Sequence, residues 1–195
     1  IDEVISGLKG TIYYSPLESL RQKGQAVLPA CETAVDMLYF KTVWKIKEKY
    51  LSGQEKKDLT QCFGTRMDML NLQWICRAKK YYHLPEGEIY AMIIPISLHL
   101  KKTEIRAMAQ AEDVEQVYAL IRNSWYGRLD LGNLEKGQSL EEPCREVIDR
   151  IYELTSRKEP YSASVLNSYL YFKEREIEKI ITTIERIRYG VAAGI

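Results

Sequence analysis

Two histidines and four cysteines are the side chains in this sequence best suited to proton transfer, nucleophilic attack or metal binding. Cys76 and His83 are seven residues apart, and His99 lies between two leucines in a predicted turn. Neither arrangement has the short, fixed Cys and His spacing of a zinc site. We therefore expect reduced, mostly buried cysteines, histidines at the surface or at helix ends, and no catalytic, cofactor-binding or metal-binding residue.

Carboxylates gather in two places, and paired carboxylates can perform acid–base chemistry. Glu174, Glu176 and Glu178 alternate with basic residues, and Glu141 is adjacent to Glu142. Such alternation is typical of a solvated helix face with ion pairs at i,i+3 and i,i+4. The sequence also contains none of the standard phosphate-binding loops or hydrolase motifs. An enzyme assembled from scattered acids, Cys76 and His83 is the least favoured interpretation.

The charge balance argues against a dedicated nucleic-acid binder. Lys and Arg number 28 against 27 Asp and Glu, so the net charge of +1 gives no long-range attraction to phosphates. A chain of 195 residues, 46% of them hydrophobic, can bury a sizeable core. The longest nearly pure apolar run, residues 90–96, is far shorter than the about 20 residues of a membrane-spanning helix. The composition is that of an ordinary globular protein.

Apolar residues recur at helical spacing almost throughout, and no stretch alternates as a half-buried strand would. The sequence therefore predicts an all-α fold. The last expected helix carries five isoleucines on one face, at positions 177, 180, 181, 184 and 187. We expect helices at residues 30–51, 54–82, 86–93, 102–110, 112–122, 140–157 and 161–189.

An internal repeat relates the two halves of the chain at an offset of about 113 residues. It pairs identical residues six times in seventeen ungapped positions, where unrelated sequences give roughly one: Lys23–Gln25 with Lys136–Gln138, Cys31 with Cys144, Asp36 with Asp149, and Tyr39 with Tyr152. Further on the offset becomes 108, which pairs Asp68 with Glu176 and Leu72 with Ile180. We infer a duplicated helical unit of about 110 residues. Residues 1–83 would end one unit whose start is missing, and residues 84–195 would form the next.

One segment is more specific than any single residue above. Residues 68–81 begin with Asp68, continue three residues later with Asn71, and end in the run Arg77-Ala78-Lys79-Lys80-Tyr81. An Ile-Ile-Pro turn follows at residues 93–95, and residues 169–177, with Glu174 and Glu176, form a second acidic helix start. This pattern resembles the C/d-type subunit family of rotary V-type and A-type ATPases, and the resemblance covers nearly the whole chain.

The resemblance implies repeated helical bundles around a pseudo-threefold axis, of which this chain would be a part. It also implies a non-catalytic central-stalk adaptor that couples the rotating shaft to the membrane proteolipid ring, for proton or sodium transport. Its partners would be the central-shaft subunits of D and F type and the ring. The protein would lie at the cytoplasmic face of the membrane, touching the membrane only through the ring.

The motif positions are the candidate site residues under this resemblance. We expect them to form bridges between helices within the chain, with contact to another protein of the ATPase as the alternative: Asp68, Asn71, Arg77, Lys79, Glu174 and Glu176. A different function stays open beside the adaptor, namely a helical scaffold that binds a soluble protein partner.

Overall fold

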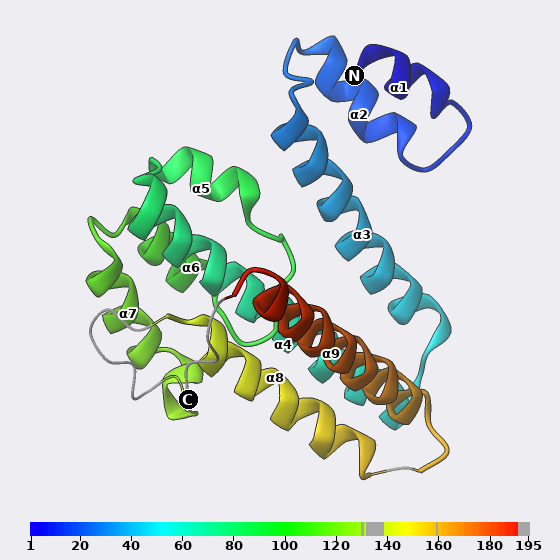
Figure 1. The fold of residues 1–195 in the computed structure, drawn as a ribbon, viewed down its shortest axis with the longest axis vertical. Coiled ribbons are helices and arrows are strands. Elements are labelled where there is room, and N and C mark those ends of the chain that lie inside the picture. The colour runs from blue at the N-terminus through cyan, green and yellow to red at the C-terminus, as the bar shows by residue number, and fades with distance from the viewer. Residues whose placement is uncertain (130, 132–138, 159, 191–195) are drawn as a thin grey trace.

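The computed structural model of this chain describes residues 1–129, 131, 139–158 and 160–190. The described residues form helices and turns without any strand, so the expected all-α class is confirmed (Figure 1). Residues 136–138, which the sequence repeat pairs with residues 23–25, lie outside the described part. The pseudo-threefold arrangement and the division at residue 83 stay predictions.

All seven expected helices are present with nearly the expected bounds, and two short helices precede them. The short helices escape the periodicity because they bury little: one apolar residue each, Ile5 and Leu17. The α-helices are α1 (Asp2–Gly7), α2 (Tyr14–Gln22), α3 (Leu28–Tyr50), α4 (Gly53–Arg77), α5 (Glu86–Met92), α6 (Lys102–Gln110), α7 (Val114–Asn123), α8 (Glu141–Ser156) and α9 (Ala163–Arg188).

Two turns of other helix types complete the list of elements. The π-helical turn η1 (Ala78–Tyr82) continues α4 and ends at His83, whose left-handed backbone (φ 49°) stops the helix. The 3₁₀ turn η2 (Trp125–Arg128) follows α7. Within the described chain, no helix combines the length and the apolar character that crossing a membrane requires.

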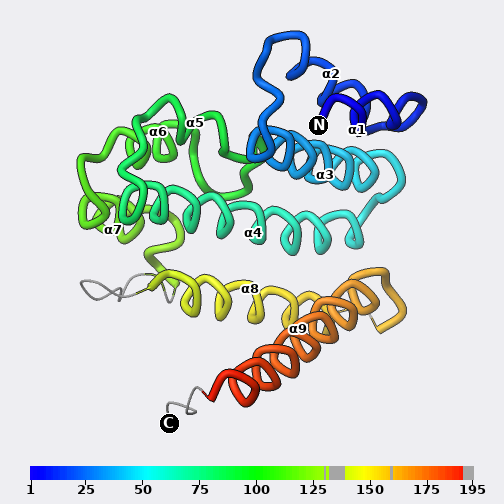
Figure 2. The backbone as a smooth tube through the Cα atoms, turned by 45° about the horizontal axis from the view of Figure 1, so that its top comes forward, coloured from blue at the N-terminus to red at the C-terminus, as the bar shows by residue number. Residues whose placement is uncertain are grey.

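The central helix is α4, which packs most extensively against α8 and also contacts α3, α5, α7 and α9. Figure 2 shows α3, α4, α8 and α9 following one another across the molecule, with α5, α6 and α7 gathered around one end of α4. The main core lies at that end, where α4 and η1 meet α5 to α8; its largest side chains include Tyr118, Tyr126, Met69, Leu72, Ile75 and Met108.

The outer helices are covered much less. In α3 only Lys47 is fully buried, and in α9 only Ser164, Ser168 and Tyr171 are buried. The five isoleucines of α9 are 50–76% exposed. The expected amphipathic helix therefore forms, but its apolar face is turned away from the core of this chain.

Candidate functional site

One face of α4 holds the loop that joins α5 to α6. Gly64, Asp68 and Asn71 follow one another at spacings of four and three residues, which places them on one side of a helix. All three are buried, and each contacts a residue of the α5–α6 loop (residues 93–101). Two of the sequence-predicted site residues, Asp68 and Asn71, are thus brought together.

Asp68 is fully buried, and its carboxyl accepts hydrogen bonds from four donors. Three are backbone N–H groups of the loop, at Leu98 (3.2 Å), His99 (2.8 Å) and Leu100 (3.3 Å), and the fourth is the Tyr126 hydroxyl of η2 (2.8 Å). Burial raises the pKa of the Asp68 carboxyl, while these donors act in the opposite direction. Asp68 therefore joins α4, the loop and η2 into one unit.

Asn71 makes a two-pronged contact with the same loop. Its Nδ2 donates to the Ile94 carbonyl (3.1 Å), and its Oδ1 accepts from the Ile94 N–H (2.8 Å). This satisfies both backbone groups of a buried residue just before Pro95. At Gly64, a Cβ would lie 2.7 Å from the Leu98 Cβ. Gly64 therefore permits a close approach of the loop to α4.

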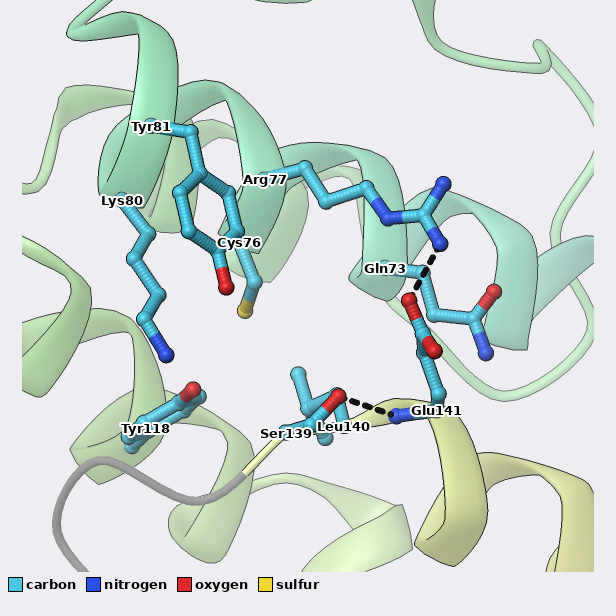
Figure 3. Close-up of a pocket in the computed structure, with 9 residues that line it drawn as sticks. All are labelled: Gln73, Cys76, Arg77, Lys80, Tyr81, Tyr118, Ser139, Leu140 and Glu141. Atoms are coloured by element: carbon cyan, nitrogen blue, oxygen red, sulfur yellow. Dashed lines mark hydrogen bonds and ion pairs between the residues drawn. The ribbon is translucent and has the colours of Figure 1, made fainter. Parts of the chain in front are cut away.

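Arg77 and Lys79 lie at the other end of the motif, at the C-terminus of α4 and in η1. The Arg77 guanidinium donates to the Glu141 carboxylate (2.5 Å) and so joins the end of α4 to the start of α8 (Figure 3). Each charge also complements its helix dipole. Both side chains are about half exposed, so the bridge adds little stability. Lys79, in η1, is partly exposed.

The cavity next to this bridge is small, about 30 Å³, with room for about two water molecules. Figure 3 shows the Cys76 sulfur facing it. Burial raises the pKa of the Cys76 thiol above its ordinary value and that of Cys144 to about 12. His83 is exposed at the end of η1. Thiolate chemistry at neutral pH is therefore disfavoured at the cysteine that the enzyme hypothesis needs.

Glu174 and Glu176 lie on α9, away from the Asp68 cluster. Glu174 is exposed and 3.8 Å from Arg66 of α4, and Glu176 pairs with Lys173 one turn earlier (2.6 Å). An open groove of about 240 Å³ between α4, α8 and α9 is lined by arginines 66, 77, 145 and 175 and by glutamates 141, 174 and 178. Because both signs of charge line it, the groove has no clear preference for an anion or a cation.

Several contacts of this arrangement were missed by sequence reasoning. The Tyr126 hydroxyl, 58 residues from Asp68, has no spacing signal that points to it. His99 stacks on Trp125 with ring centroids 3.6 Å apart, and desolvation lowers the pKa of that imidazole. Between α8 and α9, Asp149 accepts from the Tyr171 hydroxyl (2.7 Å) and pairs with Arg175. These contacts position helices and loops.

Among the described residues, no group of three or more His, Cys, Asp or Glu could hold a metal ion.

Comparison with known proteins gives one consistent result. The chain is 28% identical over 189 residues to the C subunit of the A-type ATP synthase of Pyrococcus horikoshii, covering 92% of this chain and 49% of the relative. Identity to the same protein of Pyrococcus abyssi is 27% (98% of this chain, 52% of the relative), and to that of Methanobrevibacter smithii 24% (95% and 50%). The chain spans about half the length of these curated relatives.

No solved structure matches the chain. The sequence model described as ATP synthase (C/AC39) subunit matches residues 1–194, nearly the entire sequence. The relatives share one name, and the motif residues 68–81 and 169–177 lie within the matched range. The chain therefore belongs to the ATP synthase (C/AC39) subunit family.

Proposed function

We propose that this protein is a non-catalytic adaptor of the central stalk of a rotary ATPase, which joins the rotating shaft to the proteolipid ring in the membrane. The observation that carries the proposal is the family match over residues 1–194. The relatives are named as subunits of A-type ATP synthases. The partners proposed are shaft subunits of D and F type and the ring, which would place the protein peripherally on the cytoplasmic face.

The interior of the molecule suits an element that must transmit torque. Twelve residues of α4 are buried, and close-packed interiors are stiff and transmit strain. The hydrogen bonds of Asp68 and Asn71 attach the α5–α6 loop to this central helix at several points. A rigid joint between two partners needs such internal connections, whereas an enzyme needs a site with reactive groups in reach of a substrate.

Five of the six motif residues divide into two groups by their surroundings, and the sixth, Arg77, is paired with Glu141. Asp68 and Asn71 are fully buried, which leaves them no access to a partner. Glu174 and Glu176 are exposed, and Lys79 is partly exposed. We propose that these three outer residues contribute to the contact with the shaft or the ring, while the two buried residues act within the chain.

The direct test is binding to each partner separately. The affinity of the folded chain is measured for a detergent-solubilised proteolipid ring and for the isolated shaft subunits. We expect the wild-type chain to bind both partners. The variants Lys79→Glu and Glu176→Lys should each bind one of the two partners more weakly than the wild type does. The matched controls are Lys23→Glu and Glu3→Lys, which reverse exposed charges outside the motifs. A folded chain that binds neither partner would overturn the proposal.

One observation favours the scaffold function as the second candidate. A mainly apolar groove of about 670 Å³ lies between α2, α3 and α5. Grooves of this kind accept the apolar face of a helix from another protein. Its lining includes Leu20, Val27, Ala34, Met37, Leu84 and Met92. The scaffold function predicts that the folded chain binds neither the ring nor the shaft, so the same two measurements separate the candidates.

A further inference from the structure

Lys47, near the C-terminal end of α3, is the one fully buried cation among the described residues. It is 2% exposed, and no other residue of α3 is fully buried. Lysine is almost never buried without partners, because its ammonium group loses its hydration and must replace it. The surroundings of Lys47 therefore decide whether this end of α3 can stay packed against the rest of the chain.

Three partners surround the Lys47 ammonium, which carries three N–H groups. Its Nζ donates to the Thr60 hydroxyl of α4 (2.6 Å) and to the Glu48 carboxylate (2.7 Å). The same atom lies 3.6 Å from the centre of the Trp44 ring, and the face of an indole attracts a cation. The ammonium is therefore fully served, and one of its partners lies on the neighbouring helix.

A second lysine, Lys56 of α4, connects the two oxygen partners. Its Nζ lies 2.6 Å from the other carboxylate oxygen of Glu48 and donates to the Glu48 carbonyl (3.3 Å). The Thr60 hydroxyl donates to the Lys56 carbonyl (2.6 Å), which leaves the hydroxyl oxygen free to accept from Lys47. We call these four residues (Lys47, Glu48, Lys56 and Thr60) the ionic clamp. Two of them belong to α3 and two to α4, so the ionic clamp joins the two helices.

The ionic clamp lies at the corner where α3 turns into α4. The helices are joined by Leu51 and Ser52 alone, and α4 begins at Gly53, whose left-handed backbone (φ 57°) suits a sharp change of direction. Figure 2 shows α3 and α4 side by side from this turn onward. Farther along the pair, Phe40 of α3 meets Trp74 of α4 edge to face, with ring centroids 6.4 Å apart. Ring packing thus holds the middle of the pair, and charges hold its corner.

The corner between α8 and α9, its counterpart in the sequence repeat, is joined without a buried lysine. The 108-residue offset pairs Thr60 with Ser168, whose buried hydroxyl donates to the Tyr152 carbonyl of α8 (3.0 Å). The 113-residue offset pairs Lys47 with Pro160, which carries no charge. At both corners a hydroxyl connects the two helices, but the α3–α4 corner adds a buried cation. Such a helix pair therefore closes without an ammonium group, and the charge at position 47 needs another explanation.

We propose that the ionic clamp makes the contact between α3 and α4 conditional. The corner stays closed while Glu48 and Thr60 both hold the Lys47 ammonium, and it opens when either oxygen is withdrawn. A buried cation that loses a partner is strongly destabilising, whereas an apolar side chain in the same place is tolerated. Opening turns α3, together with α1 and α2, relative to α4 about residues 51–53. The ionic clamp consists of contacts within the chain, so the proposal does not depend on the adaptor function.

Amide hydrogen exchange of the full chain tests the proposal helix by helix, because an amide exchanges when its own part of the structure opens. The double variant Glu48→Gln/Thr60→Val leaves the Lys47 ammonium without its charged partner and without its hydroxyl partner. We expect the amides of residues 39–50 to exchange about tenfold faster than in the wild type, or more. The amides of residues 65–76, in the part of α4 that belongs to the main core, should keep their rates.

The matched control makes the same two chemical changes on α3 outside the ionic clamp. Glu32→Gln/Thr33→Val alters an exposed carboxylate and a hydroxyl that, like that of Thr60, donates to a carbonyl one turn earlier (Pro29, 2.9 Å). Residues 39–50 should exchange in this control as in the wild type, because no buried charge loses a partner. A rise as large as that of the double variant would overturn the proposal.

Removal of the lysine itself gives the decisive result. Lys47→Met keeps an unbranched apolar side chain without the charge, so adding it to the double variant should return the exchange of α3 nearly to the wild-type rate. Adding Lys45→Met, which removes an exposed lysine of the same helix, should not. Unchanged exchange in the double variant, an equal rise in α3 and α4, or no rescue by Lys47→Met would each overturn the proposal. If the double variant has lost its helical circular dichroism, Thr60→Val alone takes its place, because it keeps the Glu48 carboxylate.

Discussion

The substitution Asp68→Asn tests the contact that joins α4 to the rest of the core. The Asp68 carboxyl serves four donors, three N–H groups of the α5–α6 loop and the Tyr126 hydroxyl. Asparagine has nearly the same shape but a single acceptor oxygen, and its amide N–H₂ is itself a donor. It can therefore serve about two of the four donors, and it points its own N–H groups toward the others.

The expected loss of stability follows from the number of donors that Asp68→Asn leaves without an acceptor. A buried donor without an acceptor costs about 1–3 kcal/mol, and two such donors give about 2–4 kcal/mol once partial solvent access at the loop is allowed for. For a chain of this size, about 1 kcal/mol lowers the melting temperature by about 2–4 °C. We therefore expect Asp68→Asn to lower Tm by about 6–12 °C.

Urea unfolding followed by circular dichroism at the helical band measures the free energy of unfolding for each variant. The control Asp36→Asn changes an exposed carboxylate on α3 and should stay within about 0.5 kcal/mol of the wild type. Tyr126→Phe removes only one donor and should cost about 1 kcal/mol. If the two substitutions remove a shared contact, the double variant loses less than the sum of the single losses. An Asp68→Asn variant as stable as the control would refute the reasoning.

Three further perturbations test other parts of the structure. Gly64→Ala should lower the free energy of unfolding by about 1–3 kcal/mol, because its Cβ would lie 2.7 Å from the Leu98 Cβ. Gly87→Ala is the control and should be tolerated, because nothing lies within 4 Å of the position of its Cβ. Urea unfolding compares the two variants. Desolvation lowers the pKa of His99, so the unfolded chain binds a proton there more readily than the folded chain. The free energy of unfolding should therefore fall as the pH drops below about 6.5. The variant His99→Gln should lose this part of the pH dependence, whereas the control His83→Gln, at an exposed position, should retain it. Arg77→Ala should cost less than about 1 kcal/mol, because its bridge to Glu141 is half exposed; a larger loss in thermal unfolding would contradict this.

The periodicity of apolar residues was sufficient to predict the helices because each expected helix repeats its apolar positions at helical spacing. It was not sufficient to say which faces are covered. The isoleucines of α9 have the same spacing as the buried residues of α4, yet they are exposed here. Amphipathic spacing predicts that a face packs, but the identity of what it packs against depends on chain segments that the pattern does not name.

The motif positions show a similar division. The pattern of residues 68–81 placed Asp68 and Asn71 together, because residues three apart share a helix face. The loop N–H groups and the Tyr126 hydroxyl come from segments 30 to 58 residues away, and only the folded chain brings them to the carboxyl. Gly64 is a point of close approach between α4 and Leu98 of the loop, which the spacing along the helix does not indicate. Such long-range contacts depend on tertiary packing and leave little trace in local spacing.

The central claim is that one copy of this protein connects the shaft and the ring, and simultaneous binding tests it most directly. Detergent-solubilised proteolipid ring and shaft subunits are mixed with and without the chain, and the masses of the eluted complexes are measured. The adaptor function predicts a complex of ring, chain and shaft that is absent when the chain is omitted. If the chain binds one partner only in competition with the other, or if no such complex forms with folded chain, the proposed coupling is contradicted.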